Sequence, residues 1–413
     1  MSRVLAAAAQ LQESRNTLMT ANFPRLLVAT EFPPNAPGGG PAVVRQMLQG
    51  WPEEKLFWWS CLPDKTQKFG RRVAGHAVAA IPPKLYPRRR WRSPRCWLMK
   101  GAWTPRAAGH LRKTLDTVKP DVVWMIPHAW SIPPLARVFL ESNVRFHVSI
   151  HDYADVQGAV DSFGLNRCRW MAGLTDQLYA RAATRDAICQ AMVDDLRQRT
   201  GATGVINRAG LEPHDFSQLD APLPAVADTI RIGYAGTIIV EPEFALFVAA
   251  MERIRQQLPK PVALEFFGDH SYRTRPWFNP AWMTEHGNLA LPELSAALRN
   301  CSWGFSPMAL ADDNPRYNRF SLPTKFVSYL AAGLPIISLG HPESSVVQMA
   351  AAHDVGLCST TDDAEALSQQ LRTALSEPDP RAKYRPNLRR CALEEFDAQR
   401  MRQALHAALA GQS

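Results

Sequence analysis

One stretch in the second half of the chain carries residues that suit phosphate binding. The sequence SLPTKFVSYLAAG predicts a helix that begins at Leu322 or Pro323 and has Thr324 and Lys325 in its first turn. The partial positive charge of a helix N-terminus and a lysine beside it both stabilise an anion. We therefore predict a phosphate contact at Lys325. The alternative is a solvated lysine on an ordinary helix.

Two glycine turns offer the same chemistry from the backbone. GYAGTI places Gly236 and Thr237 at the end of a predicted strand, and EFPPNAPGGGPAVV places Gly39 and Gly40 between a strand and a helix. Where a side chain is absent, backbone N–H groups can approach a ligand closely. A tight turn alone would also require glycine, and neither the dinucleotide-binding pattern nor the P-loop pattern is present. The turns therefore indicate phosphate binding only together with Lys325.

A histidine and an aspartate end a predicted strand of the first half. The strand at residues 145–150 is followed by His151 and Asp152, and the carboxyl ends of strands in α/β sheets are where ligands collect. The alternative for His151 is a histidine whose hydrogen bonds are satisfied in the core. His147 shares its strand face, but no cysteine or histidine group has zinc-like spacing. We expect no metal and no other cofactor.

A basic stretch rich in tryptophan lies near residue 90. Its predicted contact residues are Arg88, Arg89, Arg90, Trp91, Arg92, Arg95 and Trp97. Arginine attracts anionic head groups, and indole rings favour the boundary between water and acyl chains. This patch predicts contact with an anionic membrane surface. The alternative is a solvated loop whose tryptophans pack onto the domain; no nucleic-acid-binding signature accompanies it, so no nucleic-acid partner is expected.

Strands that alternate with helices must position these residues. Buried strands are predicted at residues 25–32, 55–61, 77–81, 121–126 and 145–150, and again at 230–235, 263–267, 303–306, 335–339 and 355–359. Such alternation predicts parallel sheets covered on both faces. We expect two Rossmann-like, doubly wound α/β domains that face each other across a cleft. The expected divisions are a leader at 1–24, a first Rossmann-like domain at 25–215, a linker at 216–229, a second Rossmann-like domain at 230–385, and a C-terminal helix at 386–413 that packs back on the first domain.

Bulk properties agree with a globular protein of the cytoplasm. The chain has 413 residues, 46% of them hydrophobic and 21% charged, a size that favours two domains. Its seven cysteines are dispersed, which suits a reducing compartment. No apolar run approaches the roughly 20 residues needed to cross a bilayer. The net charge of +9 permits anionic partners without choosing among them.

In their order along the chain, these motifs resemble the group 1 glycosyltransferases of family 4, which have the GT-B fold. GYAGTI, FFGD, SLPTKFVSYLAAGLPII and HDVGLCSTTDDAEAL resemble the family's donor domain, and EFPPNAPGGGPAVV, SIHDY and GVINRAGLEPHDF resemble its acceptor domain. The resemblance implies that His151 lies beside the transferred sugar, that Asp152 orients the strand end, and that Gly39 and Gly40 approach the donor phosphates or the acceptor. It also implies transfer with retention of anomeric configuration, without a metal.

The sequence departs from the family at the nucleotide. Two glutamates that flank the family's last glycine-rich turn are replaced by Phe320 and Ser328, of which Ser328 retains one hydroxyl for the ribose. The basic pair that usually follows the GYAGTI-like strand is missing. Phosphate charge would then be met by Lys325 or by nearby arginines. These are Arg273, Arg275, Arg316 and Arg319.

The leading hypothesis is a transferase that moves a sugar from a nucleotide-sugar donor to a glycan or lipid-linked acceptor. Its setting would be the synthesis of a cell-surface polysaccharide or glycolipid, peripheral on the inner face of the cytoplasmic membrane. Two alternatives remain open. One is a sugar-nucleotide epimerase with the same fold, and the other is a non-catalytic GT-B protein that binds a partner or a glycan, which the missing glutamates favour.

Overall fold

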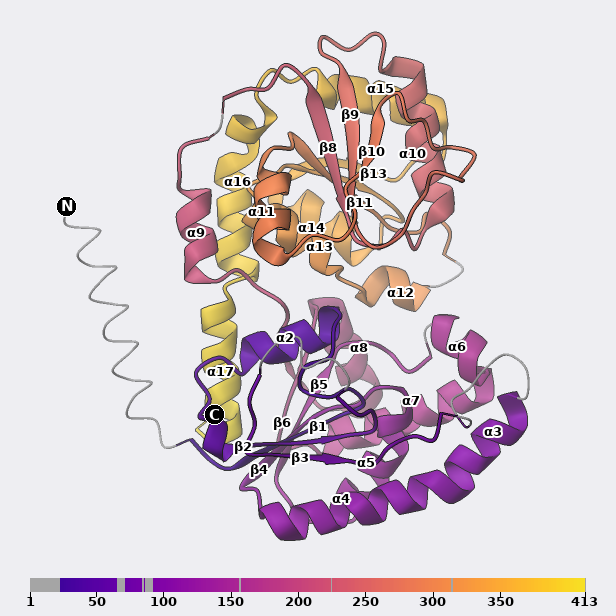
Figure 1. Cartoon of the computed structure of the whole chain (residues 1–413), viewed down its shortest axis with the longest axis vertical. Helices are drawn as coiled ribbons and strands as arrows, with labels where there is room; N and C mark the ends of the chain where they lie inside the picture. Colours follow the sequence, from indigo (N-terminus) through magenta and orange to yellow (C-terminus); the bar gives the residue numbers. More distant parts are fainter. Residues whose placement is uncertain are drawn as a thin grey trace, which may run out of the picture. The chain divides into compact units, whose positions relative to one another are not determined.

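The computed structural model describes residues 23–64, 71–83, 85, 92–155, 157–223, 225–312 and 315–412. These form two compact units (Figure 1). Unit 1 comprises Met1–Ala187, Val193–Asn207 and Met401–Ser413, and unit 2 comprises Ile188–Met192 and Arg208–Arg400. Most of the expected leader, residues 1–22, lies outside the described residues. The change of unit at Arg208 precedes the expected boundary at residue 215.

Unit 1 is built on a parallel sheet in the order β3-β2-β1-β4-β5-β6-β7. Its strands are β1 (Leu26–Thr30), β2 (Leu56–Ser60), β3 (Gly75–Val78), β4 (Val122–Ile126), β5 (Phe146–Ile150), β6 (Thr184–Ala187) and β7 (Val205–Ile206). Every residue of β1, β4 and β5 is buried. Burial without alternation is typical of a parallel sheet covered on both faces, as the sequence predicts.

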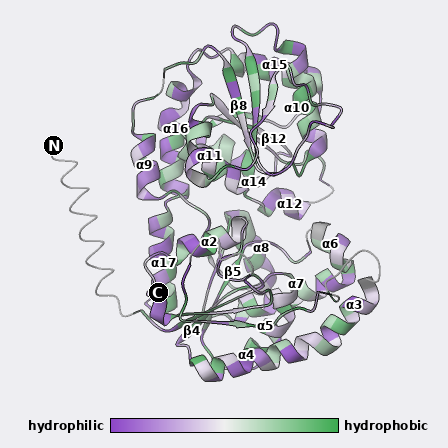
Figure 2. Ribbon diagram, in the orientation of Figure 1, coloured by the Kyte–Doolittle hydropathy of each residue, from purple (hydrophilic) through white to green (hydrophobic). Residues whose placement is uncertain are grey.

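Helices cover both faces of this sheet (Figure 1). They are α2 (Gly39–Met47), α3 (Arg92–Leu98), α4 (Thr104–Val118), α5 (Ile132–Phe139), α6 (Gln157–Phe163), α7 (Leu165–Arg181) and α8 (Gln190–Thr200), with short turns η1 (Glu53–Lys55), η2 (Met99–Trp103) and η3 (Ala129–Ser131). In α4 the buried positions Ala107, Leu111, Thr114 and Val118 recur at helical spacing. Figure 2 shows the resulting alternation of hydrophobic and hydrophilic bands along α4.

Unit 2 repeats the architecture with a parallel sheet in the order β10-β9-β8-β11-β12-β13. Its strands are β8 (Ile230–Ala235), β9 (Val262–Phe267), β10 (Met283–Glu285), β11 (Trp303–Pro307), β12 (Ile336–Leu339) and β13 (Gly356–Ser359). Its helices are α9 (Pro213–Leu219), α10 (Glu241–Ile254), α11 (Leu291–Arg299), α12 (Pro315–Phe320), α13 (Thr324–Ala331), α14 (Ser345–His353), α15 (Ala364–Leu375) and α16 (Pro380–Glu395). One face of the sheet packs an aromatic cluster in which Phe247 stacks on Phe305 at 4.0 Å. The two-domain α/β architecture is therefore confirmed.

The end of the chain differs from the single long helix predicted there. α16 ends at Glu395, and a separate helix, α17 (Ala398–Ala410), follows. Between them Phe396 is fully buried, its carbonyl accepts a 2.6 Å hydrogen bond from the Leu211 amide, and Asp397 caps the second helix through the Arg400 amide at 2.9 Å. A buried aromatic residue followed by a capping aspartate ends one helix and begins the next.

The last residues of α17 contact other parts of unit 1. Arg145 donates to the Leu409 carbonyl at 2.7 Å, and His406 bonds the Met47 carbonyl at 2.8 Å. His406 also packs edge-on against Trp51, with ring centroids 5.0 Å apart. The chain thus returns to unit 1 after completing unit 2.

Candidate functional site

Three glycines gather at the carboxyl edge of the unit 2 sheet. Gly236 follows β8 with φ of +93°, Gly268 follows β9, and Gly287 lies just beyond β10 with φ of +74°. The Gly268 amide donates to the Gly287 carbonyl at 2.9 Å, and the Gly236 amide donates to the Phe267 carbonyl at 2.7 Å. Because these strands are neighbours, their ends form one surface of backbone that side chains do not cover.

The absence of a side chain at Gly268 is required by its neighbour. A Cβ atom there would lie 2.9 Å from the Gly236 carbonyl oxygen. We expect Gly268→Ala to lower the free energy of unfolding by about 1–3 kcal/mol, because the backbone of one turn must move. Urea unfolding followed by circular dichroism measures this. Gly173→Ala is the control, since its Cβ would meet nothing within 4 Å in the middle of α7; an equal loss in both variants would contradict the explanation.

A tyrosine connects Lys325 to this glycine surface. α13 begins at Thr324 with Pro323 as its N-cap, so Lys325 is in the first turn as predicted. Its Nζ donates to the Tyr234 hydroxyl at 2.7 Å and lies 4.1 Å from the centroid of that ring. The same hydroxyl donates to the Thr237 carbonyl at 2.8 Å. Tyr234 thus joins the lysine to the turn after β8.

The pKa of Lys325 lies close to neutral pH. Desolvation by burial lowers the pKa of Lys325 to about 7. In the described part of the chain its ammonium group has no carboxylate partner and instead contacts a hydroxyl and a ring. An anion bound beside such a lysine raises its pKa, so that the ammonium group becomes fully protonated.

Residues after β9 hold the loop that follows Thr237. The Thr237 hydroxyl lies 3.2 Å from His270 Nδ1, and the Ile238 amide donates to the Tyr272 hydroxyl at 3.0 Å. Neither His270 nor Tyr272 was predicted from the sequence, and neither was Tyr234. Their common signal is position, since each lies at or just beyond the end of a strand adjacent to Gly236.

In unit 1, polar side chains gather at the carboxyl ends of three adjacent strands. Glu31 follows β1, His128 follows β4, and His151 and Asp152 follow β5. His128 Nδ1 lies 2.8 Å from Glu31 Oε2, and the Trp130 amide donates to Glu31 Oε1 at 3.4 Å. Desolvation disfavours protonated His128, but the hydrogen bond and charge of Glu31 and the charge of Asp152 outweigh it and raise the pKa of His128.

The pKa of His151 is shifted in the opposite direction to that of His128. Desolvation by burial lowers the pKa of His151 despite the charges of Asp186 and Asp152, with His128 adding repulsion. A Cβ atom placed on Gly40 would lie 3.9 Å from His151 Nδ1, so the first turn of α2 passes close to this ring. The structure therefore brings Gly39, Gly40 and His151 into one region, with a neutral imidazole beside a helix N-terminus.

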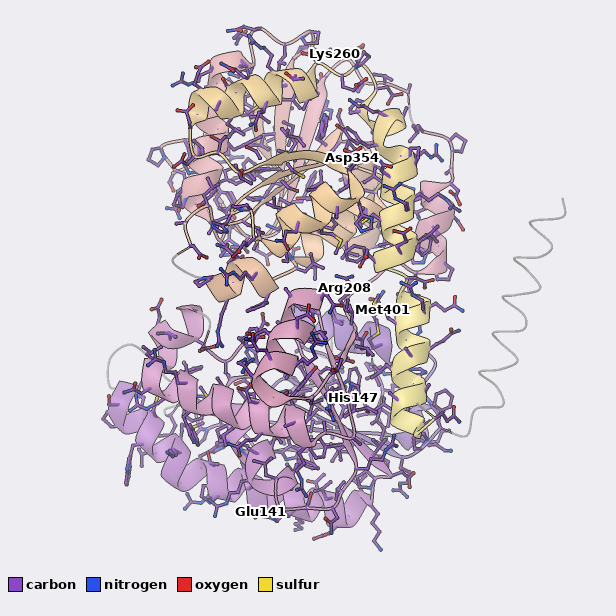
Figure 3. All side chains as sticks on the ribbon, turned by 180° about the vertical axis from the view of Figure 1, so that it is seen from behind. Glu141, His147, Arg208, Lys260, Asp354 and Met401 are labelled. Atoms are coloured by element: carbon purple, nitrogen blue, oxygen red, sulfur yellow. The ribbon has the colours of Figure 1, made fainter. Side chains whose placement is uncertain are left out.

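His147, on the same strand, has a structural role. Its Nε2 lies 2.9 Å from Asp186 and its Nδ1 lies 2.8 Å from the Thr184 hydroxyl, with His147 and Asp186 each 1% exposed. Asn207 also donates to Asp186 at 2.9 Å. Figure 3 labels His147 within unit 1 and Arg208 in unit 2. Across the described ranges no group of three or more His, Cys, Asp and Glu side chains is arranged to hold a metal ion.

Solved structures with the same architecture have been determined for sugar-transferring enzymes. The chain matches a sucrose-phosphate synthase from Thermosynechococcus elongatus (14% identity, TM-score 0.65, 92% of this chain and 97% of that one). It also matches a glycosyltransferase from Rickettsia africae ESF-5 (11%, 0.65, 95% and 100%) and an E. coli trehalose-6-phosphate structure bound with UDP-2-fluoro glucose (11%, 0.61, 93% and 99%). The chain has the GT-B fold. No family model and no curated protein sequence matches it.

Within this GT-B chain, the positions of the two missing glutamates are occupied differently. Phe320 is 8% exposed and forms part of the packed interior, and the Ser328 hydroxyl donates to the Thr324 carbonyl at 3.2 Å. Neither supplies a carboxylate. Ser328 would have to exchange its intrahelical hydrogen bond to reach a ribose.

The arginines predicted as phosphate contacts mostly have carboxylate partners in unit 2. Arg273 Nε lies 3.1 Å from Glu285, and Arg275 Nη1 lies 3.2 Å from Glu241. Arg319, which follows Arg316 on α12, pairs with Glu343 and lies 3.7 Å from Asp312. A phosphate would have to compete with these carboxylates, whereas Lys325 presents no such competition.

The basic, tryptophan-rich patch is only partly described. Arg88, Arg89, Arg90 and Trp91 lie outside the described residues, as does the side chain of Arg92. From Arg92 onward the segment is helical rather than a loop, running through α3, η2 and α4. Trp97 is 72% exposed, but Trp103 is buried and its indole donates to the Ala80 carbonyl at 3.1 Å. In the described part of the chain, no helix has both the length and the apolar content to cross a bilayer.

Proposed function

We propose that the chain is a retaining glycosyltransferase that moves a sugar from a nucleotide-sugar donor to a glycan or lipid-linked acceptor. The observation that carries the proposal is the Lys325–Tyr234–Thr237 chain of contacts beside the glycine surface of unit 2. It combines a desolvated cation, a helix N-terminus and a stretch of backbone without side chains at the carboxyl edge of a parallel sheet. Each of these stabilises a diphosphate, and the bound UDP-2-fluoro glucose in the E. coli GT-B structure supports the same class of donor.

Unit 2 would act on the leaving group. As the bond between the sugar and the diphosphate breaks, negative charge grows on the diphosphate oxygen. A protonated Lys325 and the first turn of α13 would stabilise that charge, and preorganised groups of this kind commonly supply the largest part of catalysis. In front-face transfer the same diphosphate helps to deprotonate the acceptor hydroxyl, so no protein base is needed there.

Unit 1 would orient the sugars. His151, neutral at its lowered pKa, offers one donor and one acceptor nitrogen, and Asp152 offers an exposed carboxylate for hydroxyl groups. Glu31 fixes the orientation of His128 beside them. Sugar hydroxyls need both donors and acceptors, and this edge of the sheet supplies both.

We also propose a family, a biological setting and a cellular location for the chain. The order of the motifs supports membership of family 4 and a role in cell-surface polysaccharide or glycolipid synthesis. All seven cysteines lie in the described ranges as free thiols, which supports a reducing compartment, the cytoplasm. Trp97 and Leu98, exposed on α3, support a peripheral contact with the inner face of the membrane.

The test of the proposal is a panel of uridine and guanosine diphosphate sugars, titrated calorimetrically and then incubated with native lipid extract. A transferase binds one donor and releases nucleoside diphosphate only when the acceptor is present. Conversion of the donor without any acceptor would identify an epimerase instead. Binding with no turnover in the extract would identify a non-catalytic binding protein.

The pH dependence of donor binding follows from Lys325. The ammonium form binds the diphosphate, so the complex has a higher lysine pKa than the free chain and binding takes up a proton above pH 7. Donor affinity should therefore fall as pH rises from about 7 to 8.5, by at most about tenfold per pH unit. Calorimetric titrations across this range measure it. In Lys325→Met the affinity should stay flat, and a parallel slope in that variant would assign the titration to another group.

The membrane contact can be tested at Trp97. We expect Trp97→Ser to reduce binding to vesicles of phosphatidylglycerol by about fivefold or more, because an exposed indole loses its place at the interface. Sedimentation with vesicles measures the bound fraction. The matched control is Ile239→Ser, which removes a 67% exposed hydrophobic residue from unit 2. Equal sedimentation of Trp97→Ser and the unaltered chain would remove the membrane contact at α3.

A further inference from the structure

Unit 2 contains a cavity of about 560 Å³ that the proposed reaction does not use. It is lined by one face of the sheet, the end of α11, the start of α16 and the linker residues 225–227. None of its lining residues belongs to the Gly236–Thr237 turn or to α13. A second cavity of about 370 Å³ shares Arg299, Asn300 and Arg381 with it.

The floor of the cavity is a ladder across three neighbouring strands. Glu265 on β9 accepts a hydrogen bond from Arg231 on β8 at 2.5 Å and another from His286, just beyond β10, at 2.6 Å. Glu265 is 5% exposed, and each of its carboxylate oxygens has one of these partners. The one acidic group on the floor is therefore already neutralised.

The walls of the cavity carry guanidinium groups whose N–H donors are not all used in hydrogen bonds. Arg381 donates to the Arg299 carbonyl and, at 2.9 Å, to the Ala332 carbonyl, while its buried Nε meets no acceptor within the described residues. The Arg299 side chain has no carboxylate partner in that same described part. Asp379, the other acid of the lining, accepts from the Ala382 amide at 3.0 Å. Three arginines thus face two occupied carboxylates, which leaves the cavity positive.

Much of the remaining lining is apolar and partly aromatic. Phe267 stacks on the His286 ring with centroids 5.0 Å apart and planes at 16°. Leu289, Ala297 and Val226 complete this side. A ligand that satisfies the whole lining needs an anionic group for the arginines and a flat or apolar body for this surface.

We propose that this cavity is a binding site for a small organic anion, a phosphate or carboxylate ester or acid carried on an apolar or aromatic body. The anionic group meets Arg299 and Arg381, and the body lies against Phe267 and Leu289. The linker that forms part of the wall is fixed on both sides of the cavity. Arg385 donates to the Leu219 and Ala221 carbonyls, and Lys260, labelled in Figure 3, donates to the Ala227 carbonyl at 2.8 Å. A bound anion would contact residues 225–227, beside the second of these anchors.

The test uses the full chain and three probes: phenyl phosphate, benzoate and inorganic phosphate. Isothermal titration should show saturable binding of phenyl phosphate or benzoate that is tighter than that of inorganic phosphate, and the stronger of the two identifies the preferred anion. Arg299→Gln should weaken it by about tenfold or more, the effect of losing one charged hydrogen bond. Arg372→Gln removes an exposed arginine of α15 elsewhere in unit 2 and should leave binding within twofold.

Two further measurements guard against misfolding and misassignment. Hydrogen exchange of the amides of residues 225–227 should slow when phenyl phosphate is added to the unaltered chain. Uridine diphosphate should not displace the probe. Absence of saturable binding, equal affinity in Arg299→Gln, or competitive displacement by uridine diphosphate would each overturn the assignment.

Discussion

Replacing Lys325 by methionine is expected to weaken nucleotide-sugar binding by about a hundredfold. Methionine keeps the length and the apolar stem of the side chain but removes the ammonium group. The lost interaction is a charge-assisted hydrogen bond to a diphosphate, worth about 1.5–3 kcal/mol, and the upper part of that range is a factor of about one hundred. Isothermal titration of the preferred donor into both chains measures the ratio.

We do not expect a loss of stability to cause this change, because of the environment of Lys325. Burial disfavours its charge in the free chain, and its partner is a tyrosine rather than a carboxylate. The free energy of unfolding of Lys325→Met should therefore equal or exceed that of the unaltered chain near pH 7. Lys383→Met removes an exposed lysine paired with Glu377 on the same unit and is the matched control. Unaltered donor affinity in Lys325→Met would remove Lys325 from the phosphate site.

Replacing His151 by alanine is expected to lower kcat by about one hundred- to one thousandfold. His151 lies at the carboxyl end of β5 with a lowered pKa, and in the proposed reaction its neutral ring would donate one hydrogen bond to a sugar hydroxyl in the transition state. Removing one preorganised donor of this kind costs about that much in kcat. The donor Kd should change little, because the diphosphate contacts proposed here are in unit 2. Steady-state kinetics with the native acceptor separates the two effects.

Two variants keep this prediction falsifiable. His151→Asn retains an amide donor and should recover part of kcat, which a purely structural histidine would not allow. His214→Ala removes a 71% exposed histidine of α9 and should leave kcat unchanged. A His151→Ala chain with full kcat would assign His151 to the packing of unit 1.

Regular elements with strong hydrophobic runs were predictable, whereas short polar ones were not. β1, β4 and β8 match their predicted strands to within two residues at each end because buried apolar residues dominate each of them. β6, with sequence TRDA, and β10, with sequence MTE, are too short and polar to show a period. They become strands because a neighbouring edge offers hydrogen bonds. The break at Phe396 likewise depends on Leu211, which is distant in sequence.

The site could be predicted where one segment carried the chemistry. Thr324 and Lys325 start a helix in one continuous motif, so their placement follows from local sequence. Tyr234 was hidden within an apolar strand, and only tertiary packing brings its hydroxyl to Lys325, 91 residues away. The Glu31–His128 pair joins residues 97 apart. Its signal was available in principle, since Glu31 lies near the end of the predicted strand at 25–32 and His128 lies two residues beyond the predicted strand at 121–126.

A crystal of the full chain soaked with the preferred nucleotide sugar tests the central claim most directly. We predict diphosphate density at the Gly236–Thr237 turn, with a phosphate oxygen within hydrogen-bond distance of Lys325 Nζ and of an amide in the first turn of α13. A nucleotide bound elsewhere, with Lys325 still donating only to Tyr234, would contradict the account.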